Sequence, residues 1–395
     1  MLPRLSQNPK APAFVQNPYP FYERARKLGP FFHWEDYDLT CTGNWAAVNA
    51  ILRDRRFGRE APPELAPQIP PHLAPFYAVE AHSMLELEPP RHTRLRSLVL
   101  RAFTSRRIAA LAPEIAALSE DLVAAFPSGD FDLLTAFAQP LPVRIIARLL
   151  GVPEERAPDL LAWSNAMVGM YQAGRTPAME QAAVAATEAF VAFLRGYVES
   201  RRAQPADDLI THLIAAEAEG ERLSTDELIT TCILLLNAGH EATVHTIGNG
   251  VKALLTLGDA PALVAPDRVE ATVEEILRHD PALHLFTRWA YEDVEAMGHR
   301  FRRGDRVGLL LAAANRDPAQ WDSPAAFRPS RPAKPSASFG AGLHFCVGAP
   351  LARLELQVAL PILFARHPGL RLAEKPVYAD VYHFHGLQRL MLRAE

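Results

Sequence analysis

The sequence has few cysteines and no long apolar run. Its 395 residues include three cysteines, Cys41, Cys232 and Cys346, and their spacing matches no metal finger. An odd and sparse set argues against a disulfide framework and for a reducing compartment. No apolar stretch approaches the roughly 20 residues that cross a bilayer, and the first residues lack the apolar core of a signal peptide. We therefore expect a soluble cytoplasmic protein without a membrane anchor.

The sequence also lacks a large excess of charge of one sign. The formal net charge is -4, which gives no reason to expect a nucleic-acid partner. Hydrophobic residues make up 49% of the chain, enough for a large core, and the length alone suggests two or three domains.

Residues 339–348 combine three glycines with a cysteine. Such glycines permit a tight loop, and Cys346 precedes a stretch that opens like an amphipathic helix. A helix N-terminus favours a thiolate, so Cys346 is a candidate metal ligand; the alternative is a buried structural cysteine beside a turn. The loop resembles the cysteine-ligand loop of the cytochrome P-450 family at every fixed position, namely Phe339, Gly340, Gly342, His344, Cys346 and Gly348.

The resemblance implies a haem b cofactor with Cys346 as the iron ligand. It also implies a mainly α (α+β) fold, a helical bundle around the haem with small β-sheets. Because the matching motifs must meet at one cofactor, we expect one domain over residues 1–395, in place of the two or three domains that the length alone suggests.

A long helix is predicted over residues 224–257, opened by a capping box from Ser224 to Glu227. Leu234, Ala238 and Ala242 form a stripe of shrinking side chains at four-residue spacing, which leaves room for a flat ligand. The small residues, Gly239 included, could instead serve only a close helix crossing.

The centre of this helix resembles the distal-helix signature Ala-Gly-x-acid-Thr of the family. The resemblance implies that Ala238 and Gly239 shape an oxygen-binding groove and that Glu241 relays protons. The chain departs from the signature at Ala242, where the family has threonine. Thr243 follows one residue later, about 100° further round the helix, so it cannot replace that hydroxyl directly. The proton route of this chain is left open.

Two further segments, together with His344 of the cysteine loop, match haem-holding positions. His92 and Arg96 are four residues apart on a basic amphipathic helix and share a face. Without the resemblance they would be a solvated basic face; with it they form a clamp for the haem propionates. Arg288, in a predicted strand over 285–290, and His344 match the other propionate donors.

Glu275 and Arg278 are three residues apart, and as an exposed pair they would contribute little. The family resemblance implies instead an internal network that ties this helix to the cysteine loop. Its third partner is Arg328 or Arg331, and the choice stays open because Ala326 stands where that arginine is expected.

Two features of the sequence concern the substrate side of the site. Residues 61–90 are proline-rich, and we expect a lid or binding loop there, without regular structure over 61–80. Leu234, Asn237, Ala238, Leu285 and Phe384 are candidate pocket residues, the last at the tip of a hairpin predicted over 381–387. Asn237 could orient a polar substrate or bond to a neighbouring helix.

The resemblance implies a haem-thiolate monooxygenase that uses O2 to hydroxylate a small or medium apolar substrate. The chain has no flavin or iron–sulfur motif, so we expect electrons from a ferredoxin and its NAD(P)H-dependent reductase. Arg101, Arg106, Arg107 and Arg353 are candidate docking residues for that acidic partner. Two alternatives stay open: a peroxide-driven oxygenase of the same fold, and a non-enzymatic haem-binding sensor.

Overall fold

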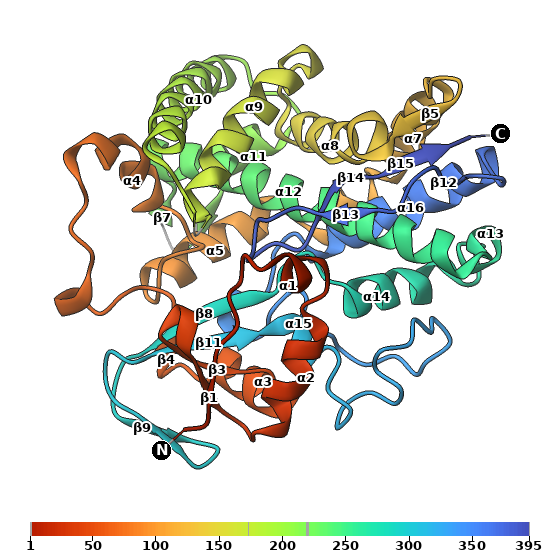
Figure 1. Cartoon of the computed structure of the whole chain (residues 1–395). Coiled ribbons are helices and arrows are strands. Elements are labelled where there is room, and N and C mark those ends of the chain that lie inside the picture. Colours follow the sequence, from red (N-terminus) through yellow and green to blue (C-terminus); the bar gives the residue numbers. More distant parts are fainter. Residues whose placement is uncertain (1, 173, 219–220, 395) are drawn as a thin grey trace.

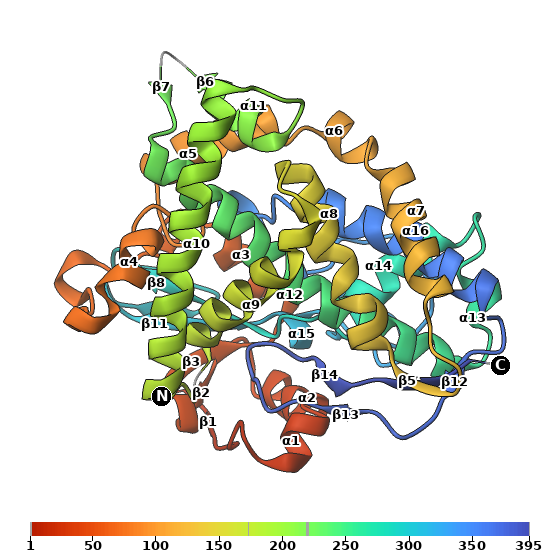
Figure 2. The same ribbon diagram turned by 90° about the horizontal axis from the view of Figure 1, so that it is seen from above.

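One long helix runs through the middle of the molecule (Figures 1 and 2). The structure is a computed structural model that describes residues 2–172, 174–218 and 221–394. Helix α12 spans Thr225–Leu257 and opens with the capping box: Glu227 N–H donates to Ser224 Oγ at 3.2 Å, and Ser224 N–H donates to Glu227 Oε2 at 2.9 Å. It ends at Gly258, whose left-handed φ of 85° suits glycine.

Helices α8, α9, α10, α14 and α16 pack against α12. Figures 1 and 2 show α8, α9 and α10 together on one side of it, opposite the N-terminal sheet. The α-helices other than α12 are α1 (Pro12–Gln16), α2 (Tyr19–Lys27), α3 (Trp45–Arg53), α4 (Ala74–Glu80), α5 (Arg91–Ala102), α6 (Ser105–Ala109), α7 (Ala112–Ala124), α8 (Pro140–Leu150), α9 (Ala157–Val168), α10 (Pro177–Ala203), α11 (Leu209–Ala215), α13 (Ala260–Leu263), α14 (Val269–His279), α15 (Leu311–Ala314) and α16 (Ala349–Arg366). Short 3-10 turns cover Glu35–Tyr37, Pro63–Leu65, Pro71–Leu73, Glu154–Arg156, Gly169–Tyr171 and Gly342–His344, and a π-helical turn covers Leu134–Ala138.

The strands form small sheets. They are β1 (Arg4–Leu5), β2 (Phe32–Trp34), β3 (Leu39–Thr42), β4 (Phe57–Gly58), β5 (Asp130–Asp132), β6 (Glu217–Ala218), β7 (Glu221–Arg222), β8 (Leu285–Ala290), β9 (Val294–Ala296), β10 (His299–Phe301), β11 (Arg306–Leu310), β12 (Arg371–Leu372), β13 (Val377–Tyr378), β14 (Leu387–Arg389) and β15 (Met391–Arg393).

The largest sheet has six strands in the order β1-β2-β3-β11-β8-β4. Its central strand β11 pairs parallel to β3 and antiparallel to β8, with Gly308 opposite both Cys41 and Thr287. A Cβ at Gly308 would lie 2.6 Å from Cys41 Sγ, so only glycine fits there. The predicted fold class, mainly helical with small sheets, is confirmed.

The buried side chains form three clusters. The largest lies among α5 to α16 around α12, a second lies between the six-stranded sheet and α3, and a third gathers aromatic residues of α1, α2 and β2. No helix of the described residues combines the length and the apolar character needed to cross a membrane.

One prediction about regular structure is wrong. The segment over 61–80 contains two 3-10 turns and helix α4. Each of these elements has a proline in its first turn, where the missing N–H would have no helical partner in any case. Prolines therefore start short helices here rather than exclude them.

Candidate functional site

A cavity of about 220 Å³ lies where α12 meets the cysteine loop. On α12 it is lined by Leu234, Leu235, Ala238, Gly239, Ala242, Thr243 and Thr246, so the stripe predicted from the sequence does face an open space. The cysteine loop contributes Phe339, His344, Phe345, Cys346, Val347 and Gly348, and α16 contributes Leu351, Ala352 and Glu355. Most of these side chains are apolar.

The loop around Cys346 requires two of its three glycines. Gly340 and Gly342 both have a left-handed φ of 68°, and a Cβ at Gly342 would lie 2.3 Å from the Leu52 carbonyl oxygen. Cys346 N–H donates to Phe339 O at 3.0 Å and closes the loop. The Cys346 thiol opens to the cavity, whereas Cys41 and Cys232 are buried.

The prediction that the helix terminus favours the Cys346 thiolate is only half right. Burial raises the pKa of the Cys346 thiol, against the N–H groups of Gly348 and Ala349 and the charges of Arg96 and Arg353, which lower it. The donors are in place, but desolvation outweighs them in the protein alone. A coordinating cation deprotonates a thiol outright, so a bound metal would supply the missing charge.

The α12 hydroxyls beside the cavity are already engaged. Thr243 Oγ1 donates to Gly239 O at 2.7 Å, and Thr246 Oγ1 donates to Ala242 O at 2.7 Å. Gly239 has a packing reason as well, because a Cβ there would lie 2.8 Å from Ile146 Cδ1 of α8. Ala242 itself presents only a methyl group to the cavity.

Glu241 does not line this cavity. Its Oε1 lies 3.1 Å from His245 Nε2, one turn further along α12, and its Oε2 lies 3.9 Å from His240 Nδ1. Burial alone would raise the pKa of Glu241, but the hydrogen bond and charge of His245, with His240, hold it below its ordinary value. The carboxyl is therefore ionised near neutral pH and is held by an imidazole.

Cationic and imidazole side chains gather at one edge of the cavity. His92, Arg96 and His344 all line it, as predicted from the sequence. The His92 and His344 rings lie 4.4 Å apart, and burial, with the charges of His344 and Arg96, lowers the pKa of His92 to about 4. His92 Nδ1 is buried and has no hydrogen-bond partner among the described residues. Such an edge favours an anion.

Arg288 is close to this edge but is not among the lining residues. It is 2% exposed and donates to Thr287 O at 2.8 Å, and burial with the charge of Arg59 lowers its pKa to about 10. Arg59 lines the cavity instead, and its buried Nε has no partner among the described residues. The sequence offered no motif that could have singled out Arg59.

Two carboxyl groups near the cavity were also missed. Glu88 Oε1 lies 2.9 Å from His344 Nε2 and accepts from Arg59 N–H at 2.7 Å. Glu355 lines the cavity, is 1% exposed, and its Oε1 has no partner among the residues the structure describes. Burial raises the pKa of Glu355 to about 8. Its place as an acid on the mostly apolar helix after Cys346 was the one signal that could have found it.

Three candidate pocket residues lie elsewhere. Leu285 precedes the cavity-lining Phe286 on β8, so strand alternation turns it into the N-terminal aromatic cluster. Asn237 faces α9, where its Nδ2 lies 3.7 Å from Met167 Sδ. Phe384 packs on His245 with ring centroids 5.7 Å apart, outside the lining of the cavity. Of the predicted pocket set, Leu234 and Ala238 line it.

Glu275 and Arg278 form the internal network predicted from the resemblance. Each is at most 2% exposed, and Arg278 binds Glu275 through two hydrogen bonds of 2.7 Å. The third partner is Arg331, whose Nε lies 3.0 Å from Glu275 Oε2, while Arg328 contributes only its backbone N–H at 2.6 Å. Ser338 Oγ donates to Leu277 O at 2.6 Å and so ties α14 to the segment before the cysteine loop.

The comparisons with known proteins agree with this geometry. The family model described as Cytochrome P450 matches residues 268–367. The chain is 36% identical over 373 residues to "Cytochrome P450 monooxygenase PikC" of Streptomyces venezuelae, covering 92% of this chain and 87% of that protein. It is 38% identical over 387 residues to "Vitamin D(3) 25-hydroxylase" of Pseudonocardia autotrophica, covering 95% and 94%.

A solved structure shares the whole fold. P450BioI, in complex with an acyl carrier protein ligated to hexadec-9Z-enoic acid, superimposes with a TM-score of 0.90 at 32% identity, over 97% of this chain and 99% of that one. This chain belongs to the cytochrome P450 family, whose members are haem-thiolate monooxygenases.

Proposed function

We propose that this chain hydroxylates a small or medium apolar organic substrate, using O2 and electrons from a ferredoxin with its NAD(P)H-dependent reductase. The observation that carries the proposal is the cavity itself. One thiol, an apolar wall of α12 and a cationic edge converge on it. Family membership alone does not give the substrate class or the electron donor, and these are what we propose here.

The residues of the cavity fit haem b. Cys346 offers the sulfur ligand, and Leu234, Ala238 and Ala242 leave a smooth apolar face for the macrocycle. The unpartnered His92 Nδ1 and Arg59 Nε call for acceptors, which two propionates would supply. Arg96 and His344 complete that edge, and Arg288 adds a buried positive charge behind it. When bound, haem supplies the redox chemistry at its iron.

The protein's own part is to orient the substrate, exclude water and deliver protons. The lining beside α12 is apolar, so it binds a hydrocarbon surface by desolvation. Glu241 is the ionised acid of the distal helix, and its carboxylate is held by His245, one turn further along. Because no hydroxyl stands at Ala242, the water that carries protons has to be held by other groups, among them a polar group of the substrate.

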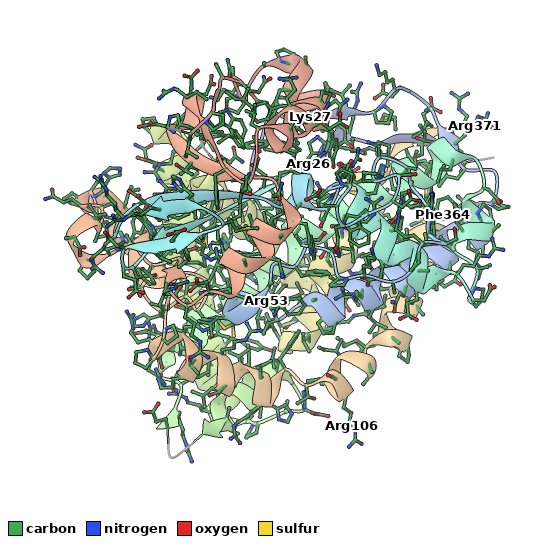
Figure 3. All side chains as sticks on the ribbon, turned by 90° about the horizontal axis from the view of Figure 1, so that it is seen from below. Arg26, Lys27, Arg53, Arg106, Phe364 and Arg371 are labelled. Carbon is green, nitrogen blue, oxygen red and sulfur yellow. The ribbon has the colours of Figure 1, made fainter. Side chains whose placement is uncertain are left out.

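An acidic redox partner would meet arginines on the cysteine side of the molecule. Arg101 and Arg106 are exposed and form no ion pair with another described residue, and Figure 3 shows Arg106 projecting away from the ribbon. Arg107 and Arg353 already pair with Asp207 and Glu274. We therefore assign the docking role to Arg101 and Arg106 first.

The test starts with the purified holoprotein. The reduced carbon monoxide complex of wild type should absorb near the wavelength of thiolate ligation, and Cys346→Ala should lose this signature. A spectral screen that follows loss of water from the ferric iron then selects ligands. Product formation from these ligands should require NADH, ferredoxin and reductase; product with hydrogen peroxide alone, at an equal rate, would favour a peroxide-driven oxygenase. No product with either oxidant would favour a haem-binding sensor.

A further inference from the structure

The acid of the distal helix has a histidine partner in this chain. Glu241 Oε1 lies 3.1 Å from His245 Nε2, at i,i+4 on the same helix. An ionised carboxylate only accepts hydrogen bonds, so His245 Nε2 must carry the proton of this bond. His240 also faces Glu241, at 3.9 Å, but forms no hydrogen bond with it.

The His245 ring is fixed by the C-terminal hairpin, which consists of the antiparallel strands β13 and β14 and the segment between them. It packs on Phe384, and a Cβ built on Gly386 would lie 1.8 Å from His245 Nδ1. Only a glycine at 386 therefore leaves room for the imidazole. His245 as a whole is 9% exposed. Its ring lies between α12 and the backbone of the hairpin.

Two buried atoms beside this ring have no hydrogen-bond partner among the described residues. They are His245 Nδ1 and Asn249 Oδ1, one helical turn further on. Asn249 Nδ2 donates to His385 O at 2.7 Å and to Asp280 O at 3.2 Å. These two bonds fix the orientation of the amide, so Oδ1 is an acceptor without a donor among the described residues. The His245 ring thus packs on Gly386 and the Asn249 amide bonds to His385, so both side chains lie against the hairpin. Buried acceptors are nearly always satisfied, and a buried water is the usual donor where protein offers none.

We propose that one buried water donates to both His245 Nδ1 and Asn249 Oδ1, and that His245 is thereby the positioning residue of the Glu241 carboxylate. The Cβ atoms of residues four apart on a helix are about 5–6 Å from each other, and a water bonded on both sides spans a similar distance. With Nδ1 accepting from the water, the neutral ring carries its proton on Nε2, the nitrogen that donates to Glu241.

The hydrogen bond from Nε2 lowers the pKa of Glu241 and holds the carboxylate of this residue, which precedes Ala242 in the sequence, in one orientation. In a chain without a hydroxyl at that position, the imidazole supplies the fixed donor that orients the acid. The inference rests on the proposed function, because it assigns Glu241 to proton delivery. The tautomer and the water can nevertheless be tested without any turnover.

The first experiment uses the holoprotein labelled with 15N-histidine, as its diamagnetic reduced carbon monoxide complex at pH 8. The His245 signals are assigned by their loss in His245→Gln. We expect a protonated Nε2 and an unprotonated, hydrogen-bonded Nδ1. A proton on Nδ1, or a crystal structure without solvent density between Nδ1 and Asn249 Oδ1, would overturn the bridge.

The second experiment separates positioning from folding. His245→Leu removes the donor, and His245→Gln keeps an N–H donor of similar reach. His33→Leu, which removes an imidazole of β2 that pairs with Asp38, is the control. With NADH and the redox partners, we expect His245→Leu to lose product per NADH by about tenfold, the scale of one lost charge-assisted hydrogen bond. His245→Gln should recover most of it, and His33→Leu should match wild type.

The same variants are assayed with hydrogen peroxide, which brings its own protons. Peroxide-driven product and the thiolate carbon monoxide spectrum should be unchanged in His245→Leu. An equal loss in the peroxide assay, or undiminished coupling with NADH, would refute the positioning role. If wild type forms no product with either oxidant, the proposed function fails, while the tautomer measured by NMR still decides the inference.

Discussion

Glu275→Ala is expected to remove a large part of the stability of this protein. The carboxylate of Glu275 accepts two bonds from Arg278, two from Arg331 and one from the Arg328 backbone N–H. The side chains of Arg278 and Arg331 are only 2% and 7% exposed, so water cannot replace the lost carboxylate. The substitution therefore leaves two buried guanidinium groups without their counter-ion.

The magnitude follows from that burial. Removing one partner of a buried ion pair costs about 3–5 kcal/mol, because the remaining charge is left uncompensated. Arg278 keeps its bonds to the carbonyl oxygens of Asn315, Pro324 and Ala326, and these carbonyls partly offset the loss. We expect a loss of about 3–4 kcal/mol, against a typical total of about 5–15 kcal/mol. Haem retention should fall with it, since this network adjoins the segment that leads into the cysteine loop.

The assay is urea unfolding of the holoprotein, followed by circular dichroism and by the haem absorbance, with equal slopes required for comparison. Arg328→Ala is the matched control: its guanidinium pairs with Asp322 at 42% and 81% side-chain exposure, so the loss should stay below about 1 kcal/mol. Glu275→Gln, which keeps one acceptor, should fall between the two. A soluble, fully haem-loaded Glu275→Ala protein within about 1 kcal/mol of wild type would refute the reasoning.

Three further predictions concern the cavity. Arg96→Leu and Arg288→Leu should each weaken haem retention, measured as haem per protein after gel filtration; occupancy equal to wild type would remove the residue from the site. Ala242→Thr should raise product per NADH for plain hydrocarbons more than for ligands that place a hydroxyl or carbonyl beside this position. Uniformly high coupling in wild type, unchanged by the hydroxyl, would contradict this. Burial raises the pKa of Glu355 to about 8, so its folded state holds a proton that the unfolded state releases above about pH 4.3. The free energy of unfolding should therefore fall between pH 5 and 8.5, and a slope unaltered in Glu355→Gln would exclude Glu355 as its source.

The cysteine loop, the capped distal helix and the Glu275–Arg278 pair could be predicted from the sequence because their signals are local. A left-handed φ demands glycine, a capping box needs two residues three apart, and an i,i+3 pair needs only a helix. The stripe of Leu234, Ala238 and Ala242 belongs to the same class. These features determined the fold class and the cofactor through the family resemblance.

The tertiary structure decided what no local pattern carries. Arg59 and Glu355 line the cavity and Glu88 bonds to the lining residue His344, and their roles depend on burial and on which partners the fold leaves them. Arg331 rather than Arg328 completes the network because of how the chain folds back on α14. The side chains of Leu285 and Asn237 point away from the cavity. Alternation along a strand and rotation about a helix set the direction of a side chain, and composition does not record that direction. The pairing of His245 with Glu241 follows from helical spacing. The burial of the His245 ring and its Nδ1 without a partner among the described residues depend on Gly386 of the hairpin, about 140 residues away in the sequence.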